Sequence, residues 1–130
     1  DKSAAVALWQ AASVMGHTDA MYDLAVCYRD GHGTRQSAIR ASLWFKNAAK
    51  AGRPEAMTAW GQCLFDGTGC MRDESAAVEW WTKGRWNGDR LASSYLQVHR
   101  ERMAAKAVWE KEQAEKAKAQ GEAEKPKKLE

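Results

Sequence analysis

The sequence predicts an all-α protein made of stacked antiparallel helix pairs. The 130 residues include 24 Ala but only 12 Val, Ile and Thr together, so residues that favour helices outnumber those that favour strands. The chain also repeats itself with a period of 36 residues, and repeats of this length are typical of stacked helix pairs. A chain of this size has room for one compact domain.

The repeat is found by shifting the sequence along itself by 36 residues without a gap. After two such shifts, residues 1–5 fall on 73–77, so the chain begins within a repeat unit. We therefore expect a half unit at 1–16, full units at 17–52 and 53–88, and a capping helix at 89–109. The matching sets are Gly16, Gly52 and Gly88; Ala20, Ala56 and Ala92; Leu24, Trp60 and Leu96; Cys27 and Cys63; Gly31 and Gly67; Gly33 and Gly69; and Trp44–Phe45 and Trp80–Trp81.

The residue pattern of each unit predicts two helices, a first helix called A and a second called B. In the first full unit Ala20, Leu24 and Tyr28 lie four residues apart on one helical face, and Gly31 follows as a residue that ends helices. A second helix follows, with apolar residues at spacings of three and four and Gly52 as its stop. Neither helix can bury its apolar stripe alone, so the units are expected to stack. The predicted helices are 3–15, 19–30, 36–51, 55–66, 73–87 and a long helix from about 89.

The last helix departs from the repeat. Met103 and Ala105 stand where a third Gly-x-Gly turn would fall, so this helix is expected to continue. We expect residues 110–130 to form a charged helical extension and a disordered tail. A further hypothesis is that the helix beyond Trp109 pairs with another helix. The sequence leaves open whether Leu129–Glu130 is an expression-vector remnant.

One unit has the pattern Ala-x-x-x-Leu-Ala-x-x-Tyr-x-x-Gly-x-Gly, followed after a linker by Ala-x-x-Trp-Phe-x-x-Ala-Ala-x-x-Gly. This pattern resembles the Sel-one-like repeat (SLR), a subclass of the tetratricopeptide-like α-solenoids, over residues 1 to about 100. The resemblance implies a right-handed α-solenoid, or α/α superhelix, of antiparallel helix pairs. Thr34 and Cys70 stand where the family prefers Val, Ser37 where it prefers Asp, and Arg85 where it prefers Ala.

The resemblance also implies a function. Known members serve as scaffolds and adaptors, and their A helices line a concave surface that meets the ligand. We therefore expect a non-catalytic protein–protein interaction module that binds a peptide or a helical partner there. Tyr22 and Phe65 are expected to anchor an apolar side chain of the partner. The concave-face residues that the resemblance indicates are Asp19, Tyr22, Val26, Arg29, Glu55, Thr58, Gln62, Phe65, Ser94, Val98 and Arg102.

Other kinds of site fit the sequence less well. The Gly-x-Gly pairs follow helices, not strands, and lack the third Gly of a phosphate-binding loop, so they are interpreted as turns. Asp30 and Asp66 are copies of one position beside such a turn and are interpreted as polar turn residues. The three His and three Cys lack zinc-ligand spacing. Because of this spacing we expect no metal, and because no nucleophile, base and orienting group can be assembled we expect no enzyme. No cofactor is expected.

An RNA-binding helical array is the second hypothesis, because one-base-per-repeat readers also stack helix pairs. The net charge of +3 comes from 20 Lys and Arg against 17 Asp and Glu spread along the chain, without the concentrated basic surface of a nucleic-acid binder. The seven Trp could stack on bases, but most lie on the predicted core stripes. Nucleic acid is therefore disfavoured relative to a protein partner.

The compartment expected for the protein follows from two features that the sequence lacks, a membrane-spanning segment and a disulfide framework. No apolar run approaches the ~20 residues that span a bilayer, so no membrane insertion is expected. Cys27, Cys63 and Cys70 are too few and odd in number for a disulfide framework, so we expect free thiols in a reducing compartment. The protein is accordingly expected to be cytoplasmic. Because the chain lacks an initiator Met, it is also expected to be a fragment of a larger chain.

Overall fold

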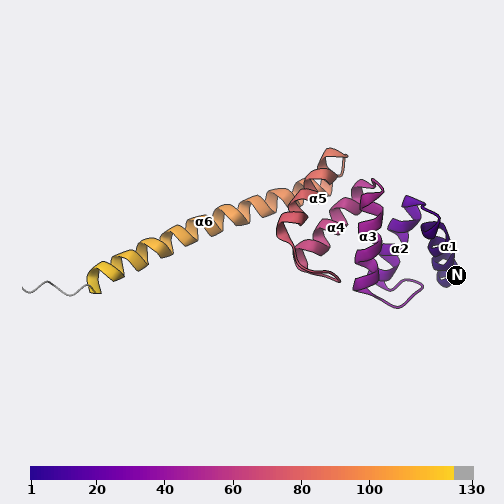
Figure 1. Ribbon diagram of the computed structural model, residues 1–130, viewed down its shortest axis with the longest axis horizontal. Helices are drawn as coiled ribbons and strands as arrows, with labels where there is room; N and C mark the ends of the chain where they lie inside the picture. Colours follow the sequence, from indigo (N-terminus) through magenta and orange to yellow (C-terminus); the bar gives the residue numbers. More distant parts are fainter. Residues whose placement is uncertain (125–130) are drawn as a thin grey trace, which may run out of the picture. The chain divides into compact units, whose positions relative to one another are not determined.

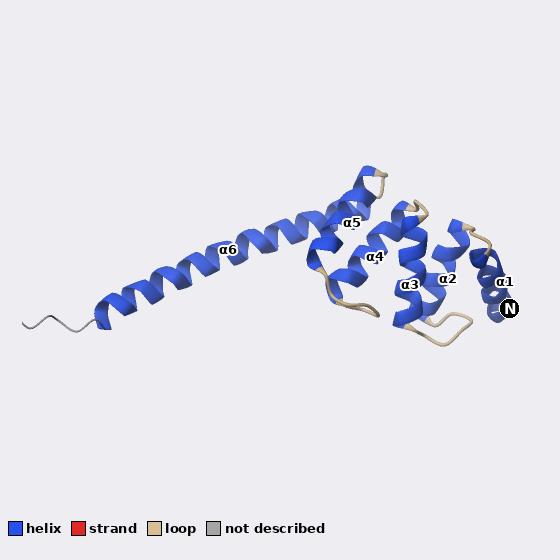
Figure 2. Ribbon diagram, viewed as in Figure 1, coloured by secondary structure: helices blue, strands red, loops and turns tan. Residues whose placement is uncertain are grey.

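The computed structural model describes residues 1–124, which form six helices and contain no strand (Figure 2). The predicted all-α class is therefore confirmed. Of the predicted disordered tail, residues 125–130, which include Leu129–Glu130, lie outside the described residues. The helices are α1 (Lys2–Val14), α2 (Thr18–Asp30), α3 (Ala38–Lys50), α4 (Pro54–Asp66), α5 (Glu74–Trp86) and α6 (Arg90–Glu124).

Polar side chains set where the B helices begin. Ser37 takes an extended conformation, and its Oγ accepts a hydrogen bond from the backbone N–H of Arg40 at 3.2 Å. This cap satisfies a backbone donor that has no partner within the helix, so α3 begins just after Ser37 and not at 36 as predicted. Asp73 caps α5 in the same way, accepting from the N–H of Ala76 at 3.0 Å.

Glycine sets where the A helices α2 and α4 end. Gly31 and Gly67 have φ of 74° and 70°, a left-handed conformation that costs glycine little. Their backbone N–H groups donate to the carbonyls of Cys27 and Cys63, respectively, which closes each helix. The chain then reverses direction, and the loop leads into the next B helix.

Helices α1 to α5 stack in the order of the sequence (Figure 1). From α1 to α5, each helix packs against the next one along the chain. The compact unit extends from Asp1 to Leu96 and so includes the first turns of α6; a second unit begins at Gln97. The domain boundary predicted after residue 109 stays a prediction.

Small residues allow close helix contacts in the core of the compact unit, and large ones fill the spaces between the helices. Ala48, Ala56 and Ala77 are completely buried. Phe45 and Trp81 are the large counterparts, with 1% and 2% of their surface exposed. The small residues Ala20, Ala25, Ala41 and Gly61 are buried as well.

The tryptophans divide between core and surface. Trp60 and Trp81 are buried, and Trp9, Trp44 and Trp80 are partly buried against the core. The exposed pair is Trp86, at 80%, and Trp109, at 60%. Five of the seven tryptophans therefore lie in the core or pack against it.

Candidate partner-binding groove

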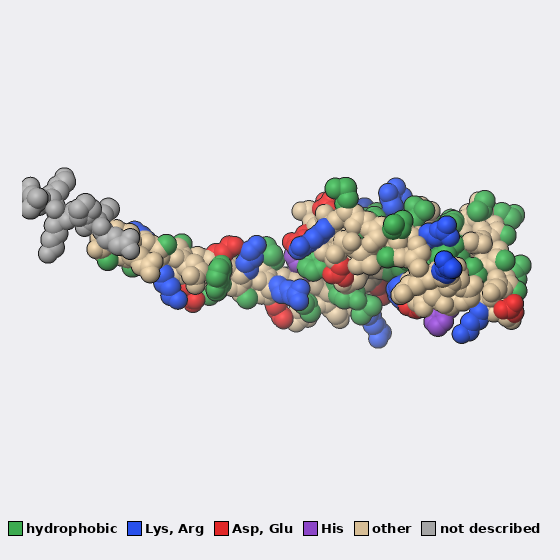
Figure 3. Space-filling model, turned by 90° about the horizontal axis from the view of Figure 1, so that it is seen from below, with side chains coloured by type: hydrophobic (Ala, Val, Ile, Leu, Met, Phe, Trp, Pro, Cys, Tyr) green, Lys and Arg blue, Asp and Glu red, His purple; other side chains and the backbone are tan. Residues whose placement is uncertain are grey.

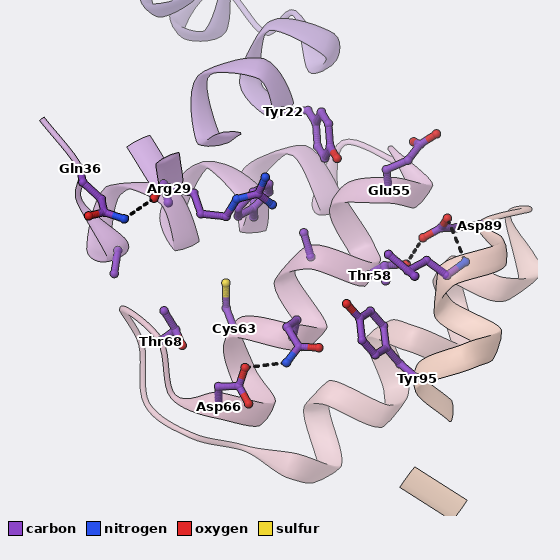
Figure 4. Close-up of a pocket in the computed structure, with 16 residues that line it drawn as sticks. Tyr22, Arg29, Gln36, Glu55, Thr58, Cys63, Asp66, Thr68, Asp89 and Tyr95 are labelled. Carbon is purple, nitrogen blue, oxygen red and sulfur yellow. Dashed lines mark hydrogen bonds between the residues drawn. The ribbon is translucent and has the colours of Figure 1, made fainter. Parts of the chain in front are cut away.

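A groove of about 610 Å³ lies on the compact unit (Figure 4). Most of its lining comes from the A helices α2 and α4 and from the start of α6, which follows them in the third A position. The lining residues are Tyr22, Arg29, Gln36, Ala38, Ala41, Phe45, Glu55, Thr58, Ala59, Gln62, Cys63, Asp66, Thr68, Asp89, Leu91 and Tyr95.

Two tyrosines project into the groove from different helices, Tyr22 from α2 and Tyr95 from α6 (Figure 4). Tyr22 packs edge-on against Phe45, with 5.8 Å between ring centroids and 62° between ring planes. Tyr95 stacks on Trp81, with 5.4 Å between centroids and 21° between planes. Because both supporting rings are almost fully buried, the tyrosines are held in place before any ligand binds.

Arg29 lies on the groove lining at the last turn of α2. Its Nε and Nη2 donate to the two carboxylate oxygens of Asp30 at 3.0 and 3.2 Å. This hydrogen bonding lowers the pKa of the Asp30 carboxyl and raises the pKa of Arg29, so both groups are charged at neutral pH. The guanidinium also lies 5.8 Å from the Phe45 ring centroid. Its charge is therefore already matched by a neighbouring carboxylate.

Arg53 is not on the groove lining, but its guanidinium contacts Tyr22, Asp19 and Glu55 at one end of the groove. Its guanidinium carbon lies 4.3 Å from the Tyr22 ring centroid. Nη1 donates to Asp19 at 2.5 Å, and Nε lies 3.4 Å from Glu55 Oε2. One cation is thus shared by two carboxylates, which leaves this end with a net negative charge.

Asp66 and Asp89 contribute two more carboxylates. Asp66, the last residue of α4, accepts a hydrogen bond from Gln62 Nε2 at 2.5 Å. Asp89 accepts hydrogen bonds from the Thr58 hydroxyl and, at 3.4 Å, from the backbone N–H of Leu91. All these donors are neutral, so neither carboxylate is neutralised through them.

The structure brings together part of the predicted binding set. Asp19 lies beside the groove, paired with Arg53. Phe65 does not line the groove but packs against Trp81, with ring centroids 5.4 Å apart, and under the Arg72 guanidinium. The predicted residues on the lining are Tyr22, Arg29, Glu55, Thr58 and Gln62. Of the others, Val26 is partly buried against the core, Ser94 is exposed, and Val98 and Arg102 belong to the unit that begins at Gln97.

Tyr95 and Asp66 line the groove although the resemblance did not indicate them. In the 36-residue register, Tyr95 falls on Ala59, which also lines the groove. The position of this aromatic residue, directly before Leu96 of the repeated A-helix set, is the feature of the sequence that could have indicated Tyr95. Asp66 stands beside its turn, as predicted, and also lines the groove.

The Cys63 thiol is the sulfur group on the groove lining. Burial, helped by nearby Cys70 and Asp66, raises the pKa of this thiol to about 11. The pKa values of Cys27 and Cys70 are raised as well, chiefly by burial. At neutral pH these thiols are therefore protonated and weakly nucleophilic.

We expect Cys63 in the folded chain to react with iodoacetamide at pH 8 roughly 10- to 100-fold more slowly than in the urea-unfolded chain, because less thiolate is present. Timed alkylation followed by peptide mass spectrometry measures the rate at each cysteine. Equal rates in the folded and unfolded chains would contradict the raised pKa.

The described part of the chain, residues 1–124, has no group of three or more His, Cys, Asp or Glu placed to hold a metal ion. None of its helices combines the length and the apolar character that crossing a bilayer requires. On the face of the compact unit drawn in Figure 3, the described Lys and Arg side chains are dispersed among other types.

Stacked helix pairs whose first helices line a groove define an α-solenoid of the tetratricopeptide-like class. The Sel1 repeat family model matches residues 18–52 and 54–85, just over half of the chain. The chain therefore belongs to the Sel1 repeat family.

Curated relatives are similar over part of the chain. An exopolysaccharide production negative regulator of Rhizobium leguminosarum bv. viciae is 39% identical over 58 residues, 45% of this chain and 22% of the relative. The chitin synthase regulator SKT5 of Malassezia restricta is 32% identical over 98 residues, 74% of this chain and 7% of the relative. The chain thus spans less than a quarter of either relative.

Solved structures have the same fold. A Sel1 repeat protein from Oxalobacter formigenes matches with a TM-score of 0.71 and 22% identity, over 74% of this chain and 40% of the other. The protective antigen c5321 of uropathogenic Escherichia coli, which has an SLR fold, matches with a TM-score of 0.76 and 29% identity, over 78% of this chain and 22% of the other. Helicobacter pylori cysteine rich protein B matches with a TM-score of 0.66 and 18% identity, over 70% of this chain and 68% of the other. The predicted solenoid is confirmed.

Sel1 repeat proteins typically act in protein interaction and regulation, and both curated relatives are named as regulators. This agrees with the predicted class of function.

Proposed function

We propose that this chain is a non-catalytic protein-interaction module of a scaffold or adaptor, which binds a peptide or helical segment of another protein in the groove. The observation that carries the proposal is the pair of tyrosines, Tyr22 and Tyr95, each fixed by a buried aromatic ring. Aromatic anchors of this kind dominate binding energy, and their prior ordering lowers the entropy cost of binding.

The lining supports recognition and not catalysis. No histidine is among the lining residues, and the Cys63 thiol is kept protonated by its raised pKa. The remaining lining combines aromatic and small apolar groups with hydroxyl, amide and carboxylate groups, a composition typical of ligand sites. A volume of about 610 Å³ accommodates a few side chains of a peptide.

The RNA-binding alternative gains no support from the groove. Glu55, Asp66 and Asp89 place carboxylates on the lining, where they would repel a phosphate backbone. Arg29, the cation of the lining, is already paired with Asp30. A protein segment therefore fits the groove better than a nucleic acid.

Selection of a phage-displayed library of random 12-residue peptides on the immobilised chain tests the proposal. We expect selected peptides to bind the Tyr22→Ala variant at least tenfold more weakly, because truncating an aromatic anchor costs more than about 1.4 kcal/mol. Fluorescence polarisation of the labelled peptides measures the affinity, and far-UV circular dichroism checks that the variant is folded.

The matched control is Trp86→Ala, which removes an exposed aromatic side chain outside the groove lining and should leave affinity unchanged. Failure to select any peptide, or peptides that bind wild type and Tyr22→Ala equally well, would count against the proposal.

A further inference from the structure

The floor of the groove is one face of α4 along its whole length. The lining residues at 55, 58, 59, 62, 63 and 66 follow the spacing of three and four that places side chains on one helical stripe. Glu55 lies in the first turn and Asp66 is the last residue, so about 16 Å of helix axis separates them at 1.5 Å per residue. Between them the stripe is uncharged, since it consists of Thr58, Ala59, Gln62 and Cys63.

The groove is acidic although the chain as a whole is basic. The lining includes Glu55, Asp66 and Asp89 but only one cation, Arg29, whereas the chain carries a net charge of +3. Asp30 pairs with Arg29 through two hydrogen bonds, so this cation offsets none of the three lining carboxylates. A local charge opposite to that of the whole chain favours a ligand of positive charge.

Each end of the stripe keeps unmatched negative charge. At one end, Glu55 shares the Arg53 guanidinium with Asp19. At the other end, Asp66 has a neutral amide partner, Gln62, and lies at the carboxyl end of a helix, where the backbone dipole adds negative potential. Both carboxylates belong to exposed residues, so a ligand can reach them.

We propose, resting on the function above, that the bound segment is a basic extended peptide lying along α4, with two Lys or Arg side chains about four or six residues apart on one face of the peptide. An extended chain rises ~3.3 Å per residue and places every second side chain on the same face, so separations of four and six residues, roughly 13 and 20 Å, bracket the ~16 Å between Glu55 and Asp66. The cations meet these two carboxylates, and the intervening side chains contact Tyr22 and Tyr95. Arginine and lysine stems also pack well on tyrosine rings.

The peptides from the library selection test this specificity. Those that depend on Tyr22 are expected to carry Lys or Arg at two positions about four or six residues apart. Their affinity should fall about tenfold on the Glu55→Gln/Asp66→Asn double variant, because two charge-assisted contacts are lost. Replacing both basic residues of one such peptide by Gln should give a similar loss on the wild-type chain and little further loss on the double variant.

The control variant Glu79→Gln/Glu112→Gln also removes two exposed carboxylates, but none from the groove, and should retain wild-type affinity. Peptides that depend on Tyr22 but are acidic or uncharged, or basic peptides that bind the double variant as tightly as wild type, would overturn the charge specificity and leave the interaction function intact. Absence of any Tyr22-dependent peptide would overturn both.

Discussion

Replacing Trp81 by Ala is expected to lower the free energy of unfolding by about 3–5 kcal/mol, because a buried aromatic side chain is lost and leaves a cavity. Trp81 is 2% exposed, stacks on Tyr95 and packs against Phe65. Its Nε1 also donates a hydrogen bond to the Thr58 carbonyl at 3.2 Å. Urea unfolding followed by far-UV circular dichroism measures the change.

Trp86 provides the matched control in the same helix. It is 80% exposed, so Trp86→Ala should change the free energy of unfolding by less than about 0.5 kcal/mol. The Trp81→Phe variant keeps an aromatic ring but loses the hydrogen bond to Thr58, and we expect an intermediate loss. Similar losses for Trp81→Ala and Trp86→Ala would show that Trp81 does not pack in a core between α4 and α5.

Replacing Gly69 by Ala is expected to lower the free energy of unfolding by about 3 kcal/mol, from left-handed strain and a steric overlap together. Gly69 has a φ of +72°, and a Cβ there would overlap the backbone carbonyl of Ala38 at the start of α3. The Gly69 carbonyl also accepts a hydrogen bond from the Ser42 hydroxyl at 3.0 Å. The loop after α4 therefore packs directly against the preceding B helix. The same urea measurement applies.

The Gly31→Ala variant separates the left-handed backbone strain from the steric overlap. Gly31 has a φ of +74°, but the nearest atom to an added Cβ is Gln36 Cβ at 3.4 Å, an ordinary contact. This variant should therefore show the strain alone, roughly 1–2 kcal/mol. Equal losses for the two variants would mean that the contact between loop and helix contributes nothing.

Much of the fold follows from the repeat. The 36-residue register places Leu24, Trp60 and Leu96 at one A-helix position and predicts the order of helices that the structure has. Hydrophobic periodicity decides this because it depends only on the geometry of a single helix. The starts of the B helices are less certain from sequence, since the cap at Ser37 depends on its local backbone conformation.

The groove was predictable only in part. The assignment of A helices to the binding face located Tyr22, Glu55 and Gln62 on the lining, but Phe65 packs on Trp81, and Tyr95 lines the groove instead of Ser94. Residues one position apart on a helix point about 100° from each other, so a small rotation of the helix decides which of them faces a cavity.

By itself, the sequence determined the helical class, the order of the helices, and the buried stripe Ala20, Leu24 and Tyr28 of α2. Tertiary structure alone decided that Gly69 meets the backbone of α3, and that Glu55 and Asp66 lie at the two ends of an otherwise uncharged stripe of α4 that lines one groove with Tyr22 and Tyr95. The physical reason is the distance along the chain over which each kind of interaction acts. Periodicity and capping act within a few residues of the chain, whereas close approach, shared cavities and their charge depend on how separate helices are rotated and packed against one another.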